Sequence, residues 1–108
     1  MKCAWILPEE PLKGSGKLLQ RLLSQGDEIY LLTEEQEIPQ SLKEEKDLHI
    51  VPCPENIPAF LAGEKIREAL CVVNKARGML EEVQRTEELT GDASCSIRLC
   101  LMNGNEYR

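Results

Sequence analysis

Short apolar runs alternate with amphipathic segments along this chain. Four of these runs are bounded by proline, glycine or acidic residues, and they predict strands over residues 2–7, 28–33, 47–51 and 95–102. Between the first two runs, paired leucines share one face and predict a helix over residues 15–25, which Gly26 ends. Residues 39–45 predict a short surface helix.

The strongest periodic pattern lies in residues 57–89, which we predict to form one long amphipathic helix. Ile66, Val73 and Leu80 recur every seven residues, and Gly63 is a point at which a first turn could break off. A small apolar residue follows three positions after each of them, and these are Ala69, Ala76 and Val83. A second apolar row widens the stripe, and it comprises Leu70, Val72 and Met79. An apolar surface wider than one sheet contact predicts self-association through this helix or through the terminal strand, because small parallel sheets have edges to cover.

The alternation of strands and helices predicts an α/β fold. We expect a single α/β domain over residues 1–108, with a small three-layer, mostly parallel sheet of four or five strands and one long helix. The alternative is a ferredoxin-like α+β two-layer sandwich. It stays open because residues 34–46 are weakly helical and could form the loop of a hairpin.

Composition and charge exclude several classes of partner. The net charge is −6, from 13 Lys and Arg against 19 Asp and Glu, so we expect no nucleic-acid partner and no membrane surface. No apolar run reaches the ~20 residues of a membrane span. The five cysteines form no C-x-x-C pair and no export signal precedes them, so we expect reduced thiols, a cytoplasmic location and no metal site.

The loop after the first predicted strand is the main candidate for ligand binding. Gly14, Ser15, Gly16 and Lys17 join a strand to a helix, where free backbone N–H groups and the helix dipole can hold an anion such as a phosphate. Glu34 ends the second predicted strand 20 residues after Gly14, the position of a ribose-binding acid in Rossmann-like domains. The competing interpretation is a plain turn and helix cap.

The glycine loop departs from both known phosphate-binding patterns. Pro11 replaces the first glycine of a P-loop, and Leu19 replaces the third glycine of the dinucleotide fingerprint. Glu9 and Glu10 border the loop and would repel a phosphate. The strand, the Gly-x-Gly turn and the leucine-rich helix resemble the start of many nucleotide-sugar epimerases and glycosyltransferases. The resemblance covers roughly the first third of the chain, which is shorter than either enzyme.

Cys53 is a second candidate, as a reactive thiol. It follows a predicted strand and precedes a helical segment, and a thiol at a helix N-terminus gains reactivity. Small α/β sulfur-carrier proteins use a single cysteine in this way. The competing interpretation is a small apolar residue at a strand end. His49, the one histidine, has no evident nucleophile or acid beside it in the sequence.

Three functional hypotheses follow in order of preference. The first is a non-enzymatic domain that forms a homo-oligomer or binds a protein partner. The second is a domain that binds a nucleotide or another small anionic ligand through residues 14–17 and Glu34. The third is a sulfur carrier or enzyme that uses Cys53. None of them specifies a cofactor.

Overall fold

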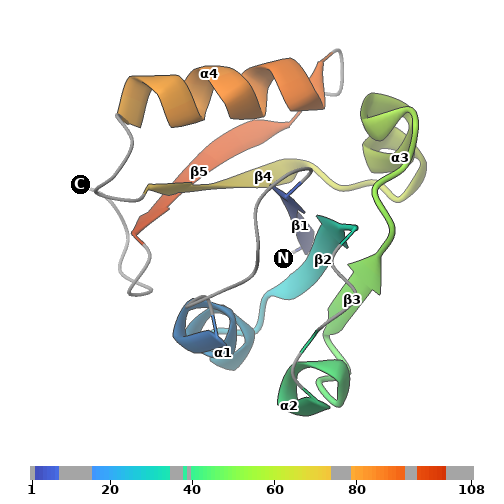
Figure 1. Ribbon diagram of the computed structural model, residues 1–108, viewed down its shortest axis with the longest axis vertical. Coiled ribbons are helices and arrows are strands. Elements are labelled where there is room, and N and C mark those ends of the chain that lie inside the picture. Colours follow the sequence, from blue (N-terminus) through green and yellow to red (C-terminus); the bar gives the residue numbers. More distant parts are fainter. Residues whose placement is uncertain are drawn as a thin grey trace.

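The computed structural model describes residues 2–7, 16–34, 38, 40–73, 79–91 and 95–101. Within these residues the chain forms five strands and four helices, which alternate in sequence (Figure 1). The strands are β1 (Lys2–Leu7), β2 (Glu28–Thr33), β3 (Leu48–Val51), β4 (Glu68–Val73) and β5 (Ser96–Leu101). The helices are α1 (Gly16–Ser24), α2 (Gln40–Lys43), α3 (Ile57–Gly63) and α4 (Met79–Thr90).

The five strands form one parallel sheet in the order β3-β2-β1-β4-β5. The predicted α/β class with a mostly parallel sheet is therefore confirmed, and the ferredoxin-like alternative is wrong. β1 lies at the centre, with Leu7 opposite Thr33 of β2 and Trp5 opposite Leu70 of β4. Parallel pairing suits these strands because their apolar runs are buried on both faces.

Helices cover both faces of the sheet. α1 and α2 lie on one face, and α3 and α4 lie on the other (Figure 1). The side chains of β1 alternate between the faces: Trp5 packs with the leucines of α1, whereas Ala4 packs with Leu61 of α3. Aliphatic side chains dominate both clusters, so the core lies in two layers on either side of the sheet.

The predicted long helix over residues 57–89 is wrong. Two shorter helices, α3 and α4, flank a strand, β4, in which Ala69 and Leu70 are fully or almost fully buried. β4 is a continuous apolar run, and such a run can satisfy a helical period by chance when it is short. Four apolar residues of the predicted stripe, Ile66, Ala69, Leu70 and Val72, are therefore buried in the core, so they do not form an apolar face of one long helix that could support self-association.

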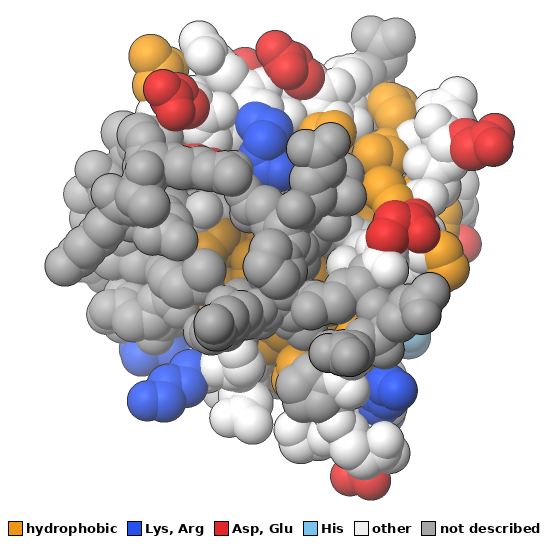
Figure 2. Space-filling view, in the orientation of Figure 1, with side chains coloured by type: hydrophobic (Ala, Val, Ile, Leu, Met, Phe, Trp, Pro, Cys, Tyr) orange, Lys and Arg blue, Asp and Glu red, His pale blue; other side chains and the backbone are white. Residues whose placement is uncertain are grey.

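No helix in the described part of the chain is long and apolar enough to cross a membrane. Figure 2 shows one face of the molecule, on which acidic side chains lie over α4, beside α3 and near α2, and basic side chains lie beside α1 and α2 and over α4. Leu80 of α4, which the sequence pattern placed in the apolar stripe, is exposed instead.

Candidate functional site

The strand order reverses beside β1, at the centre of the sheet. From β1 the chain adds β2 and then β3 on one side, whereas β4 and β5 extend the sheet on the other side. In parallel α/β sheets, ligands bind outside the carboxyl ends of the strands at this point of reversal. Here those ends are Leu7 of β1 and Val73 of β4, and the segments that follow, 8–15 and 74–78, lie outside the described residues.

Three of the five candidate ligand-binding residues, Gly16, Lys17 and Glu34, are described, and they follow β1 and β2 at this edge of the sheet. Glu34 follows Thr33, the residue of β2 that lies opposite Leu7, so Glu34 stands beside the exit from β1. Gly16 and Lys17 are the first two residues of α1. Gly14 and Ser15 lie outside the described residues. The edge therefore combines the start of a helix with an exposed carboxylate on the adjacent strand.

The backbone at Gly16 is open to close approach. A Cβ built at Gly16 would meet nothing within 4 Å. The glycine is therefore not required by packing inside the protein, although its missing side chain leaves room for a ligand at the first turn of α1. No acidic residue occupies the first turn of α1, so the positive end of the helix dipole is not neutralised there.

Cys53 lies at the same edge, after β3. Burial raises the pKa of its thiol, and the negative charge of Glu34 raises that pKa further, so the two side chains are electrostatic neighbours. A nucleophilic thiol needs the opposite shift. The arrangement favours Cys53 as a packed, protonated thiol, and the proposal of a reactive cysteine gains no support from it.

A polar cluster that the sequence pattern did not indicate lies at the amino ends of β2 and β3. His49 Nε2 lies 2.8 Å from Glu28 Oε1, and the Tyr30 hydroxyl donates to the same oxygen at 3.3 Å. The Tyr30 ring stacks on His49 with centroids 4.6 Å apart. The hydrogen bond from His49 lowers the pKa of Glu28 although partial burial opposes the shift. Glu28, Tyr30 and His49 are therefore bonded or stacked to one another, which indicates a structural role.

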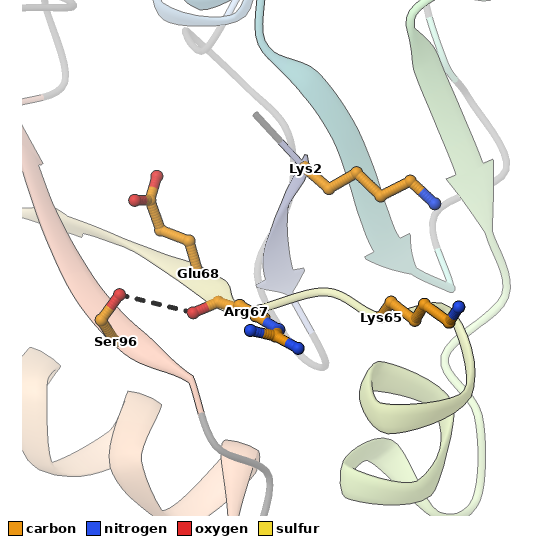
Figure 3. Close-up of a pocket in the computed structure, with 5 residues that line it drawn as sticks. All are labelled: Lys2, Lys65, Arg67, Glu68 and Ser96. Atoms are coloured by element: carbon orange, nitrogen blue, oxygen red, sulfur yellow. Dashed lines mark hydrogen bonds between the residues drawn. The ribbon is translucent and has the colours of Figure 1, made fainter.

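A pocket of about 360 Å³ opens near this cluster, at the amino ends of β1, β4 and β5. We call it the amino-end pocket. Its lining residues are Lys2, Lys65, Arg67, Glu68 and Ser96 (Figure 3). They come from parts of the chain far apart in sequence, so only the strand order could have brought them together.

Among the described residues no group of histidine, cysteine and acidic side chains is arranged to hold a metal ion. Comparison of the chain with protein-family models, with curated proteins and with solved structures gave no match.

Proposed function

We propose that this protein is a small Rossmann-like domain that binds the ribose and diphosphate of a nucleotide at the carboxyl edge of its sheet. The observation that carries the proposal is the strand order β3-β2-β1-β4-β5, all parallel, with β1 in the centre. This order is the one in which dinucleotide-binding domains hold their ligand, beside the first strand and at the start of the first helix.

The individual side chains fit the two halves of such a ligand. The diphosphate would lie against the first turn of α1, where Gly16 permits close approach and Lys17 is exposed. Glu34 would accept hydrogen bonds from the ribose hydroxyls at the end of β2, the strand next to β1. The proposal concerns binding alone, because the groups described at this edge account for contacts with a ligand and not for a reaction.

Self-association, the function first favoured from the sequence, has less support. It was predicted through an apolar helical surface or through the terminal strand. β4 instead buries Ala69, Leu70 and Val72 of that surface between its neighbours β1 and β5, and association through the terminal strand stays a prediction. Leu80 is the exposed large hydrophobic side chain among the described residues. A single exposed leucine is ordinary for a protein surface and does not call for a partner.

Isothermal titration with ADP tests the proposal, since ADP carries the ribose and diphosphate without a second base. The protein should bind ADP, and Glu34→Gln should weaken binding by about tenfold or more because it removes a charge-assisted hydrogen bond to the ribose. Gly16→Ala should weaken binding while leaving the fold intact, since a Cβ there meets no protein atom within 4 Å. Glu87→Gln, a change at an exposed site on α4, is the matched control. Absence of ADP binding, or equal affinity in Glu34→Gln and the control, contradicts the proposal.

A further inference from the structure

We propose that the amino-end pocket binds the phosphate group of a small phosphate-bearing molecule. Three of its lining residues are cations, Lys2, Lys65 and Arg67, and one is a carboxylate. This local excess of positive charge stands against a chain with net charge −6. The pocket lies at the opposite edge of the sheet from the proposed nucleotide site, so the inference does not depend on that proposal.

The backbone of Lys65 is the first reason to assign a role to the pocket. Helix α3 ends in a Schellman motif: Ile66 N–H donates to Leu61 O at 2.9 Å, and Lys65 N–H donates to Ala62 O at 3.2 Å. The motif requires a positive φ, which is 58° at Lys65, the only positive φ of a non-glycine residue among the described residues. An L-residue in this conformation costs roughly 1–2 kcal/mol.

Helix α1 ends in the same motif and shows the usual solution. Asp27 N–H donates to Leu22 O at 3.2 Å, Gly26 N–H donates to Leu23 O at 3.1 Å, and Gly26 has a φ of 91°. Glycine adopts this conformation without a steric penalty. The chain thus places glycine at one of two equivalent helix ends and a strained lysine at the other. Strain of this kind clusters at functional sites and persists where the surrounding structure enforces it.

Lys2 is held beside the same helix end. Its ammonium donates to Glu64 O at 3.2 Å, at the C-terminus of α3, and lies 5.7 Å from the centre of the Tyr30 ring. These contacts direct the Lys2 side chain away from β1 and across β2, and its ammonium lies on the same side as that of Lys65 in Figure 3. An ammonium has three N–H donors, so the bond to the carbonyl leaves donors for a bound anion.

Arg67 and Glu68 complete the lining with opposite charges on opposite sides. Ser96 fixes the start of β4 because its N–H and its hydroxyl both donate to Arg67 O, at 2.9 and 3.4 Å. The Glu68 side chain points away from the three cations in Figure 3, and its Oε1 accepts a hydrogen bond from Arg98 at 3.3 Å. Arg98 therefore compensates the Glu68 carboxylate, and the Glu28 carboxylate offsets part of the charge of Lys2, so Lys65 and Arg67 supply most of the positive charge of the pocket.

The lining determines the class of ligand. Ammonium and guanidinium groups both suit a phosphate, whose oxygens accept charge-assisted hydrogen bonds. The volume of about 360 Å³ is at the lower end of the range for small-molecule sites. None of the lining residues in the described part of the chain is aromatic, so these residues offer no ring on which a base could stack. A compact phosphate ester fits these features better than a nucleotide.

Binding of inorganic phosphate and pyrophosphate, measured by isothermal titration at physiological ionic strength, tests the inference in a set of variants. Lys65→Gly and Arg67→Gln should each weaken pyrophosphate binding by about tenfold, because each removes a charge-assisted contact. Lys65→Gly should also raise the midpoint of thermal unfolding without ligand, because it relieves the positive φ. If Lys65 served only to stabilise the fold, Lys65→Gly would instead lower the midpoint of thermal unfolding.

Lys43→Gln, a change at an exposed lysine of α2, is the control for general loss of positive charge and should leave the affinity unchanged. Lys17→Gln separates the two edges of the sheet, because it changes the proposed nucleotide site alone. The inference is overturned if the unaltered protein binds neither anion, if Arg67→Gln has no more effect than Lys43→Gln, or if Lys17→Gln abolishes binding while Lys65→Gly and Arg67→Gln do not. The last result would support anion binding at the proposed nucleotide site and would rule out phosphate binding in the amino-end pocket.

Discussion

Arg98 Nη1 donates a hydrogen bond to Asp27 Oδ2 at 3.0 Å and thereby joins β5 to the turn that precedes β2. The same nitrogen donates to Glu68 Oε1 at 3.3 Å, and Nη2 donates to Gln25 Oε1 at 3.4 Å. Burial disfavours the charge of Arg98, but the hydrogen bond to Asp27 and the nearby negative charges, those of Asp27 and Glu68 among them, together outweigh it and raise the pKa of the guanidinium. The network therefore connects β5, β4 and the turn that precedes β2, which are distant from one another in the sequence.

Arg98→Met should lower the free energy of unfolding by about 2–3 kcal/mol, because it leaves two largely buried carboxylates without their cation. Urea denaturation measures the change, and Arg21→Met, at an exposed position on α1, should stay within about 0.5 kcal/mol of the unaltered protein. Equal stability of the two variants would show that Arg98 contributes no more than a surface charge.

Gly91 should not tolerate a side chain. It follows α4 with a φ of 53°, and a Cβ there would lie 2.8 Å from Pro58 Cγ of α3. Gly91→Ala should therefore destabilise the protein by about 1–3 kcal/mol, through backbone strain and displacement of α3. Gly63→Ala is the matched control, because a Cβ at Gly63 meets nothing within 4 Å and alanine favours the helix. Similar thermal unfolding of both variants contradicts the packing of Gly91 on Pro58.

The Glu28–His49 contact should make stability depend on acid pH. The pKa of Glu28 is lowered in the folded state, chiefly by its hydrogen bond with His49. The contribution of Glu28 is therefore fully present above its unfolded pKa of about 4.5 and is lost as the pH falls through the lower folded value. In denaturation curves, the stability difference between the unaltered protein and Glu28→Gln should shrink below about pH 4.5. If this stability difference persists unchanged into strong acid, the contact does not lower the pKa of Glu28. The same conclusion follows if the effect of Glu28→Gln depends equally on pH in protein that carries His49→Gln.

Cys53 should react slowly with thiol reagents at neutral pH. Burial raises the pKa of its thiol above the ordinary value of 9.0, with a further contribution from Glu34. Labelling by iodoacetamide, followed by mass spectrometry, should be slower than for free cysteine, and Glu34→Gln should accelerate it by removing the negative charge. Labelling faster than free cysteine would restore the sulfur-carrier hypothesis.

The pattern of apolar residues predicted β1, α1 and β2 well because proline and glycine bound each of them. It failed at β4, where residues 69–73 form an apolar run whose spacing also fits a helix. Helix α3 ends where Lys65 adopts a positive φ. Glycine is the residue expected at such a position, so the sequence does not mark this helix end. β4 was not predicted because the end of α3 at Lys65 was not recognised in the sequence.

The candidate site at the carboxyl edge of the sheet could be predicted from the sequence, whereas the pocket at the amino edge could not. The glycine segment and Glu34 could be placed together because consecutive parallel strands end at the same edge. The amino-end pocket could not, since it joins Lys2, Lys65 and Ser96 through the pairing of β1 with β4 and of β4 with β5. Those pairings depend on the strand order, which alternation of strands and helices does not determine.

Titration of the ¹⁵N-labelled protein with ADP, followed through its amide NMR signals, tests nucleotide binding at the carboxyl edge most directly. We expect the signals of Gly16, Lys17 and Glu34 to move together and saturably, with those of Lys65 and Ser96 unchanged at the same ADP concentrations. Saturating ADP that leaves the three carboxyl-edge signals in place would show that the point of strand reversal in this sheet does not hold a nucleotide.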